Sequence, residues 1–252
     1  MDPKGKVAVI TGGAAGIGLA TAKLLAASGA RLAIADIDSA AGTAAAREIE
    51  ASGGEARFVR TDVTRPRDLE RMLDYAAQQF GRVDIMINNA GVDDAGQDFF
   101  APGADRWERT LAIDLAAVMR GTQLAVQRMR GQGGGVIINV ASMGGLIPMA
   151  MGPVYAASKA GAIHFTRSLA YLADEGIRVN VICPTFTDTA LVRRHGELVV
   201  EQMKREVGGL LTPEQVAEGV LELVRDESRA GAVMRVTVRK GIDYIFEPKP
   251  PA

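Results

Sequence analysis

Short apolar runs alternate along the chain with longer stretches in which apolar and polar residues recur at helical spacing. Seven of these runs are almost continuously apolar and rich in β-branched residues. They span residues 7–11, 31–36, 56–62, 83–89, 135–142, 178–184 and 232–238. A short, nearly continuous apolar run is typical of a strand that is buried on both faces, so the pattern predicts seven such strands.

The stretches between these runs predict helices. Those with the clearest pattern span residues 16–29, 65–81, 104–131 and 152–174. The first ends at Gly29, and the second has Pro66 in its first turn and Gly81 at its end, which are the residue types expected at helix boundaries. Strands that alternate with helices indicate a parallel sheet that is covered on both faces.

This alternation predicts an α/β protein with a single-domain Rossmann fold. The expected sheet is seven-stranded, parallel and doubly wound, with helices on both faces. The length of 252 residues and the hydrophobic share of 48% suit one such sheet with a sizeable core. Because no repeat or linker marks a second unit, we expect one domain over residues 1–252.

Composition narrows the functional classes. The net charge is −1, with 29 Lys and Arg against 30 Asp and Glu, so neither a nucleic acid nor a membrane surface is an expected partner. The single cysteine, Cys183, cannot form an internal disulfide, which fits a reducing compartment. The first apolar run is too short for a signal peptide or a membrane span, so we expect a cytoplasmic protein.

A glycine-rich stretch, "TGGAAGIG", joins the first predicted strand to the first predicted helix. Gly12, Gly16 and Gly18 permit a tight turn and let the backbone approach a pyrophosphate, whose charge is stabilised at the helix N-terminus. Ala15 and Ile17 lie in the same stretch. The position between a strand and a helix is the one a dinucleotide-binding loop requires, so all five residues are expected to contact such a cofactor.

The second predicted strand ends at Asp36, which lies 18 residues after Gly18 (36 − 18). A carboxylate at that position can accept hydrogen bonds from the ribose diol of an adenosine, and it repels a 2′-phosphate. The next residues, Ile37 and Asp38, are not basic, which favours NAD over NADP. The alternative is that Asp36 caps the helix that follows.

Two further strand ends carry candidate cofactor residues. Asp62 and Val63 close the third strand, where they can hold the adenine ring. Asn89, Ala90 and Gly91 close the fourth. The carboxyl ends of parallel strands meet at one edge of the sheet, where ligands bind in such folds. Alternatively, Asp62 caps a helix and the Asn-Gly stretch forms an ordinary turn.

Tyr155 and Lys159 are four residues apart in the helical segment 153–165, so both side chains leave the same face. One interpretation is a tyrosine that packs against a surface lysine. The other is a proton-transfer pair. Ser142 lies 13 residues before Tyr155 (155 − 142).

The glycine loop, the Asn-Asn-Ala-Gly stretch, Ser142, and Tyr155 with Lys159 together resemble the short-chain dehydrogenase/reductase family. The resemblance covers essentially the whole chain. Within the family, residues 133–168 and 178–191 are most similar to the 15-hydroxyprostaglandin dehydrogenase group and related bacterial NAD-dependent alcohol dehydrogenases.

The resemblance implies an NAD-dependent enzyme that transfers a hydride between a secondary alcohol or ketone and the nicotinamide, without a metal. Tyr155 is then the acid/base, Lys159 lowers its pKa, and Ser142 holds the substrate oxygen. The family has an asparagine where this chain has Asp114. Asp114 is therefore a catalytic candidate whose negative charge partly cancels that of Lys159.

The resemblance also assigns a nicotinamide-binding segment after the sixth strand. Its expected contact residues are Pro184, Thr185, Phe186, Thr187 and Thr189. The family usually has glycine at the position of Thr185. Residues 190–210 are expected to form a lid over the substrate, or alternatively an ordinary amphipathic surface helix.

The resemblance further implies a homodimer or homotetramer that packs through the helices at 104–131 and 152–174. Two alternatives to alcohol oxidation remain open at this point. One is a ketone reductase that runs the same chemistry in reverse. The other is a non-catalytic dinucleotide-binding or sensing protein that has kept the fold.

Overall fold

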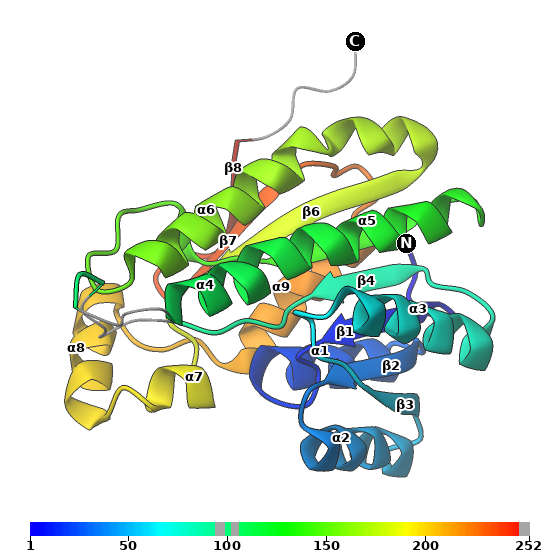
Figure 1. The fold of residues 1–252 in the computed structure, drawn as a ribbon, viewed down its shortest axis with the longest axis horizontal. Helices are drawn as coiled ribbons and strands as arrows, with labels where there is room; N and C mark the ends of the chain where they lie inside the picture. Colours follow the sequence, from blue (N-terminus) through cyan, green and yellow to red (C-terminus); the bar gives the residue numbers. More distant parts are fainter. Residues whose placement is uncertain (94–98, 102–105, 247–252) are drawn as a thin grey trace.

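The protein forms one twisted sheet with helices on both faces in a computed structural model that describes residues 1–93, 99–101 and 106–246 (Figure 1). The strands are β1 Val7–Thr11, β2 Arg31–Asp36, β3 Glu55–Arg60, β4 Ile85–Asn88, β5 Gly135–Val140, β6 Ile177–Pro184, β7 Val233–Thr237 and β8 Gly241–Ile245. Their order across the sheet is β3-β2-β1-β4-β5-β6-β7-β8. The order reverses between β1 and β4, which is the point where ligands bind in doubly wound sheets.

The expected strand number of seven is wrong: the described chain has eight strands in this sheet. The first seven are parallel, as predicted, and β8 pairs antiparallel with β7. β8 lies at the edge of the sheet and is only partly buried, and Asp243 interrupts its apolar residues. A half-exposed edge strand carries no continuous apolar run, which is why the pattern missed it.

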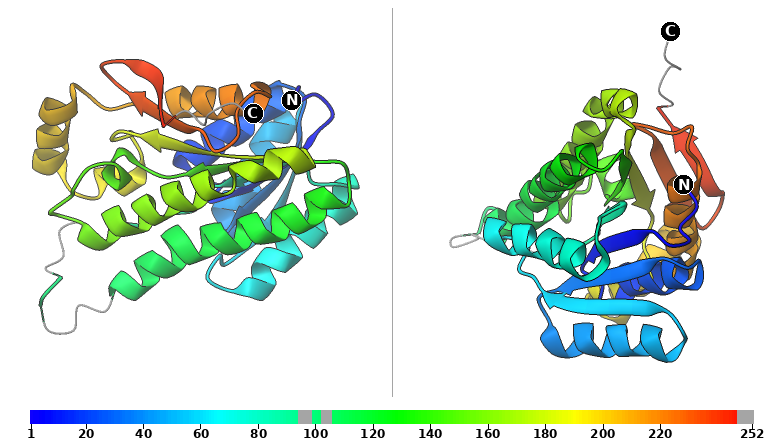
Figure 2. Two further views of the ribbon diagram at one scale, coloured as in Figure 1. Left: turned by 90° about the horizontal axis from the view of Figure 1, so that it is seen from above. Right: turned by 90° about the vertical axis from the view of Figure 1, so that its right-hand side faces the viewer.

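The helices cover the two faces in separate layers (Figure 2). The α-helices are α1 Gly16–Ala27, α2 Ser39–Ala51, α3 Pro66–Phe80, α4 Arg106–Leu111, α5 Ala117–Arg130, α6 Pro153–Ser168, α7 Ala190–Arg193, α8 Glu197–Val207 and α9 Pro213–Arg225. Buried side chains of α1, α2 and α9 belong to one core cluster, those of α3 and α5 belong to a second, and Ile163 of α6 belongs to a third, smaller one.

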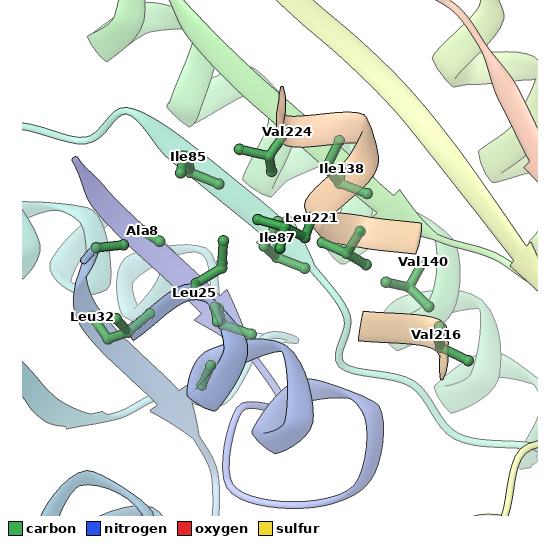
Figure 3. Packing of buried hydrophobic residues seen from close by; sticks show 14 of the residues in the cluster. Ala8, Leu25, Leu32, Ile85, Ile87, Ile138, Val140, Val216, Leu221 and Val224 are labelled. Carbon is green, nitrogen blue, oxygen red and sulfur yellow. The ribbon is translucent and has the colours of Figure 1, made fainter. Parts of the chain in front are cut away.

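Side chains of β1 alternate between the first two clusters. Ile10 of β1 points into the first cluster, where Leu25 of α1 and Val220 of α9 also pack. Figure 3 shows part of this packing, with Leu25 and Leu221 on either side of Ile87. Val9, the neighbour of Ile10, points into the second cluster. Because both of their faces are covered, the central strands β1, β4 and β5 are buried at every position rather than at every second one.

Two predicted helices are interrupted. The segment expected at 104–131 contains α4, a π-helical turn at Ala112–Ala116 and α5, whereas residues 104–105 lie outside the described part of the chain. The segment expected at 152–174 is α6 followed by a 3₁₀ turn at Ala170–Glu175. The candidate lid is two helices, α7 and α8.

Within the ranges that the structure describes, no helix is both long enough and apolar enough to cross a membrane.

Candidate active site

The glycine loop is a cradle that side chains would fill. Gly12 and Gly16 have φ values of +62° and +52°, a left-handed backbone conformation that favours glycine. A Cβ on Gly18 would lie 2.1 Å from the carbonyl oxygen of Gly12, and one on Gly12 would lie 2.9 Å from Cα of Ala90. The loop therefore needs glycine both for its turn and for its close contact with the end of β4.

The N-terminus of α1 faces this cradle without a capping side chain. The residue before the helix is Ala15, which is exposed and makes no side-chain cap. The first N–H groups of a helix lack intrahelical acceptors and carry the positive end of the helix dipole. The loop residues therefore fit the pyrophosphate of a dinucleotide.

Asp36 is tied to the glycine loop and is not a helix cap. One carboxylate oxygen accepts a hydrogen bond of 3.1 Å from the N–H of Ala14, and the other accepts one of 3.1 Å from the N–H of Asp38. The cap of α2 is Asp38, which accepts from Ala40 and Ala41. The alternative in which Asp36 caps this helix is therefore wrong. Ile37 beside it is exposed.

Asp62 does not cap α3 either, since that helix begins after Arg65 without a side-chain cap. Instead, Asp62 accepts hydrogen bonds from Thr64, through its N–H at 3.0 Å and its hydroxyl at 2.6 Å. The hydroxyl bond holds the pKa of Asp62 below its usual value. Asp62 and Val63 follow β3, beside the end of β2 that carries Asp36.

Asn89 joins the end of β4 to the glycine loop. Its side-chain amide donates to the carbonyl oxygens of Thr11 and Gly12 at 2.9 and 3.0 Å. The N–H groups of Asn89 and Ala90 donate to the hydroxyl of Thr11 at 3.0 and 3.1 Å. The Asn-Asn-Ala-Gly stretch is thus a specific connection between β1 and β4 at the point where the strand order reverses.

Lys159 is buried inside the site. Only 4% of the residue is exposed, so the alternative of a surface lysine beside Tyr155 is wrong. Its Nζ donates to the carbonyl oxygen of Val140 at 3.2 Å and lies 3.2 Å from Oδ2 of Asp114. A Cβ on Gly91 would lie 3.4 Å from this amine. The ends of β4 and β5 therefore enclose the ammonium.

Asp114 lies in the π-helical turn and is fully buried. Its Oδ1 accepts a hydrogen bond of 2.9 Å from the N–H of Val92. Oδ2 makes the ion pair with Lys159 but receives no aligned hydrogen bond from the described residues. π-helical turns of this kind recur at functional sites because they redirect a side chain out of the regular helical face.

Tyr155, on α6, contacts both Ser142 and Lys159. Its phenol shares a hydrogen bond with Ser142, and Nζ of Lys159 lies 5.5 Å from the centre of its ring. The Ser142 hydroxyl also accepts a hydrogen bond of 3.1 Å from the N–H of Gly144. Ser142 follows β5, so the sheet and α6 together hold the three side chains at one place.

Burial is the strongest influence on the acid/base groups. It raises the pKa of Tyr155, whereas the charge of Lys159 and the hydrogen bond with Ser142 lower it. The carboxylates of Asp114 and Asp93 raise the pKa of Tyr155 further. Lys159 and Asp114 thus act with the expected signs, and desolvation outweighs the lysine, so the net shift of the Tyr155 pKa is upward.

Lys159 and Asp114, the two charged groups beside Tyr155, each shift the pKa of the other. Burial disfavours the ammonium of Lys159, but Asp114 and Tyr155 hold its pKa above the usual value. Burial also raises the pKa of Asp114, and the charge of Lys159 opposes that increase.

The segment after β6 packs over the glycine loop. A Cβ on Gly16 would lie 3.1 Å from Cγ2 of Thr189. Thr187 is buried, and its hydroxyl donates to the carbonyl oxygen of Thr185 at 3.1 Å. The backbone of Phe186 accepts from the N–H of Leu211 at 2.9 Å, which ties this segment to the chain that returns from the lid.

Threonine is tolerated where the family usually has glycine. Among the described residues, Phe246 is the one non-glycine residue with positive φ. Thr185 therefore does not adopt the left-handed conformation that favours glycine, and its N–H bonds to the carbonyl oxygen of Val236 at 2.9 Å.

Asp93 is a residue that the sequence argument missed. It follows β4 by a few residues and contacts Arg194 and His195 of the lid. The signal available in the sequence was an acid two residues after the Asn-Asn-Ala-Gly stretch and an arginine next to a histidine in the predicted lid. Nothing in their spacing indicated that they meet, because they are 101 and 102 residues apart.

Comparison with known proteins places the chain in a family. The family model described as short chain dehydrogenase matches residues 6–198. The chain is 38% identical to mouse 15-hydroxyprostaglandin dehydrogenase [NAD(+)] over 98% of this chain and 97% of the relative. It is also 38% identical to cis-4-hydroxycyclohexanecarboxylate dehydrogenase of Sinomonas cyclohexanicum, over 92% of this chain and 94% of the relative.

A solved structure agrees with these sequence matches. The crystal structure of a short-chain type dehydrogenase/reductase from Mycobacterium marinum superposes with a TM-score of 0.88 and 32% identity, over 94% of this chain and 95% of the other. The fold, the site geometry and the sequence matches agree: the chain belongs to the short-chain dehydrogenase/reductase family of oxidoreductases.

Proposed function

We propose that this enzyme transfers a hydride between a secondary alcohol or ketone and NAD, with Tyr155 as the acid/base. The observation that carries the proposal is the convergence of Tyr155, Ser142 and the buried ammonium of Lys159 beside the glycine cradle. A phenol that contacts a buried cation can release and accept a proton, and a serine hydroxyl on the same side can hold the substrate oxygen.

The residues of the cradle fit the dinucleotide. The backbone of Gly12–Gly18 holds the pyrophosphate at the start of α1, and the carboxylate of Asp36 accepts hydrogen bonds from the hydroxyls of the adenosine ribose. The carboxylate of Asp36 also repels a 2′-phosphate, which favours NAD over NADP, and the mouse relative is named for NAD(+). Bound NAD⁺ supplies the hydride acceptor for alcohol oxidation.

Further strand ends complete the binding of the cofactor in this proposal. Asp62 and Val63 hold the adenine, and Asn89, Ala90 and Gly91 line the sheet edge. The segment Pro184–Thr189, which packs against the glycine loop, contacts the nicotinamide. Lys159 also binds the hydroxyls of the nicotinamide ribose.

In alcohol oxidation, the phenolate form of Tyr155 takes the hydroxyl proton of the substrate as the substrate carbon becomes a carbonyl. Ser142 holds the substrate oxygen within reach of Tyr155. Lys159 stabilises the phenolate, and the positive charge of an oxidised nicotinamide adds to this stabilisation. For ketone reduction, Tyr155 returns the proton to the carbonyl oxygen.

Asp114 serves this site as a positioning residue. Its Oδ2 lies 3.2 Å from the lysine amine, and its other oxygen fixes the backbone at Val92. The carboxylate keeps Lys159 charged in a buried place, but it also raises the pKa of Tyr155. Asp114 therefore orients the ammonium of Lys159 but destabilises the phenolate of Tyr155.

The substrate is an apolar hydroxy compound. Met149 folds over Gly144, since a Cβ on Gly144 would lie 2.3 Å from the sulfur of Met149. The hydroxyl of Ser142 lies close to the same position. Ile147 and Met151 in the same loop are exposed, as is Leu198 on α8. An apolar loop that follows Ser142 suits a substrate with a hydrocarbon framework.

A panel of secondary alcohols tests the proposal. Each alcohol is mixed with enzyme and either NAD⁺ or NADP⁺, and the absorbance of the reduced nicotinamide is followed. Turnover with NAD⁺, preferentially for apolar alcohols, supports it. Tight NAD⁺ binding without turnover of any alcohol or ketone would instead favour a non-catalytic dinucleotide-binding protein, and tighter NADP⁺ binding would contradict the role of Asp36.

We also propose a homodimer or homotetramer that packs through α5 and α6. Met119 and Tyr171 are exposed apolar residues beside these helices, and they border a groove with Phe165 and Leu169. A reducing, cytoplasmic location fits the single, buried Cys183.

A further inference from the structure

An ionic contact joins the lid to the loop that follows β4. Arg194, which follows α7, donates to both the side chain and the backbone carbonyl of Asp93, the latter at 2.6 Å. The imidazole Nε2 of His195 lies 3.2 Å from the other carboxylate oxygen of Asp93. One carboxylate therefore engages two adjacent residues of the lid at once.

Asp93 is largely enclosed by these contacts. Its side chain is 10% exposed and that of His195 is 13% exposed, whereas Arg194 keeps 47% of its side chain in solvent. A carboxylate that loses most of its hydration needs hydrogen-bond donors in compensation. The lid supplies such donors. The contacts with Asp93 therefore stabilise the lid in the closed position.

The same loop leads directly to the catalytic groups. The N–H of Val92, the neighbour of Asp93, donates to Asp114 at 2.9 Å, and Asp114 lies 3.2 Å from Lys159. The charge of Asp93 is close enough to Tyr155 to raise its pKa. Asp93 is thus joined to the lysine of the acid/base pair through its neighbour Val92, one hydrogen bond to Asp114 and one ion pair.

Backbone contacts join the two ends of the lid to each other. Thr187 pairs with Leu211 as an isolated bridge, and the N–H of Asp188 donates to the carbonyl oxygen of Leu211 at 2.8 Å. Gly196 and Gly208, with φ values of +84° and +91°, flank α8. Because a glycine lies on each side of α8 and the chain beyond them is held by backbone contacts, α8 can move as a unit.

We propose that Asp93 is a positioning residue that holds the lid over the substrate site, with Arg194 and His195 as its partners. The contact fixes the lid between its two helices, whereas the Thr187–Leu211 bridge joins the chain that precedes α7 to the chain that follows α8. Both views place α7 and α8 at the end of the molecule where α4 and α6 begin (Figures 1 and 2). The identity of the enclosed space as a substrate site rests on the proposed function.

Asp93→Asn and Arg194→Ala test this role, each measured alone and together. Either change is expected to raise KM for the alcohol by about five- to tenfold, with a smaller effect on kcat and no change in the dissociation constant of NAD⁺. The double variant is expected to match the stronger single variant, because both changes remove the same ion pair between Asp93 and Arg194. Arg194→Lys keeps the charge and should lie closer to the wild type than Arg194→Ala.

Arg205→Ala is the matched control, since it removes an exposed cation from α8 of the same lid. It should leave KM unchanged. A similar rise of KM in Arg205→Ala would overturn the proposal, because the effect would then come from the total charge of the lid.

Limited digestion by thermolysin gives a readout that needs neither substrate nor turnover. Cleavage within α7 and α8 requires local opening, so the lid of Asp93→Asn should be cut about five- to tenfold faster than that of the wild type, at an unchanged global melting temperature. Equal cleavage rates in wild type, Asp93→Asn and Arg194→Ala would overturn the proposal. Because this result does not depend on hydride transfer, it separates failure of the lid contact from failure of the proposed function.

Discussion

At the scale of single residues, the aspartate that stands where the family has asparagine places a negative charge beside the acid/base pair. Asp114 pairs with Lys159 at 3.2 Å and raises the pKa of Tyr155. An aspartate there makes the lysine a partner of two acidic groups, a carboxyl and a phenol. The carboxylate of Asp114 orients Lys159 but raises the pKa of Tyr155, whereas the ammonium of Lys159 lowers it. The two charges therefore have opposite effects on Tyr155.

Asp114→Asn tests this balance. Removing the carboxylate should lower the pKa of Tyr155, so the phenolate persists to lower pH and the acidic limb of kcat/KM for alcohol oxidation moves to lower pH. Turnover at neutral pH is expected to equal that of the wild type or to rise by up to about tenfold. The measurement is a pH profile of kcat/KM for both enzymes.

Asp243→Asn is the control for a change of net charge, because this residue lies on the edge strand β8 and pairs with Arg235. Its pH profile should follow that of the wild type. A large loss of turnover in Asp114→Asn would mean that Asp114 has a task that an amide cannot perform, which contradicts the positioning role.

The residue scale also shows where sequence reasoning ends. The spacing of Tyr155 and Lys159 on one helical face predicted that they meet, because that contact is local. The pairing of Asp93 with Arg194 joins residues 101 positions apart, and it depends on how the lid folds back over the sheet. Local periodicity contains no information about such a contact.

At the scale of elements, most boundaries follow from local patterns. β1 and β2 match the predicted ranges, and α3 begins at Pro66 and has Gly81 at its C-terminal cap, with φ of +87°. The π-helical turn around Asp114 was not predicted, since it shifts the helical register without a change in apolar pattern. β8 was missed because it is only partly buried and Asp243 interrupts its apolar residues.

The join between β1 and α1 offers a test at this scale. Gly18→Ala places a Cβ 2.1 Å from the backbone oxygen of Gly12, where no flexible side chain can move aside. The loop must shift, which is expected to destabilise the fold by about 1–3 kcal/mol and to weaken NAD⁺ binding at least about tenfold. Chemical denaturation and a binding titration measure the two effects.

Gly131→Ala is the matched control, since its Cβ would meet only the carbonyl oxygen of Arg128 at an ordinary 3.6 Å. We expect a change in stability within about 0.5 kcal/mol of zero. If Gly18→Ala binds NAD⁺ as tightly as the wild type, the glycine loop does not hold the pyrophosphate.

At the scale of the whole molecule, parallel strand order explains why the candidate site could be predicted. The ends of β1 to β6 meet at one edge, so residues from six separate stretches were expected to converge there. The structure brings Ser142, Tyr155, Lys159 and Asp114 together at that edge. Burial of these groups, which controls their pKa values, depends on the packed fold and could not be predicted from spacing.

The assembly is a prediction at this scale. The chain mass is 26.6 kDa, and light scattering after size-exclusion chromatography should give twice or four times that value. Met119→Arg places a charge on the exposed apolar surface of α5 and should shift the enzyme toward smaller species. A wild-type mass of one chain at micromolar concentration would contradict the proposed packing of α5 and α6.

The central claim is that the Tyr155 hydroxyl, held beside Lys159 and Ser142, moves the proton during hydride transfer. The most direct measurement is single-turnover reduction of NAD⁺ by an accepted alcohol in the wild type and in Tyr155→Phe, with NAD⁺ affinity determined for both. The account predicts a loss in rate of about 10²- to 10⁴-fold in the variant at nearly unchanged NAD⁺ affinity. Equal rates in the two enzymes would contradict it, because the proton would then have another acceptor.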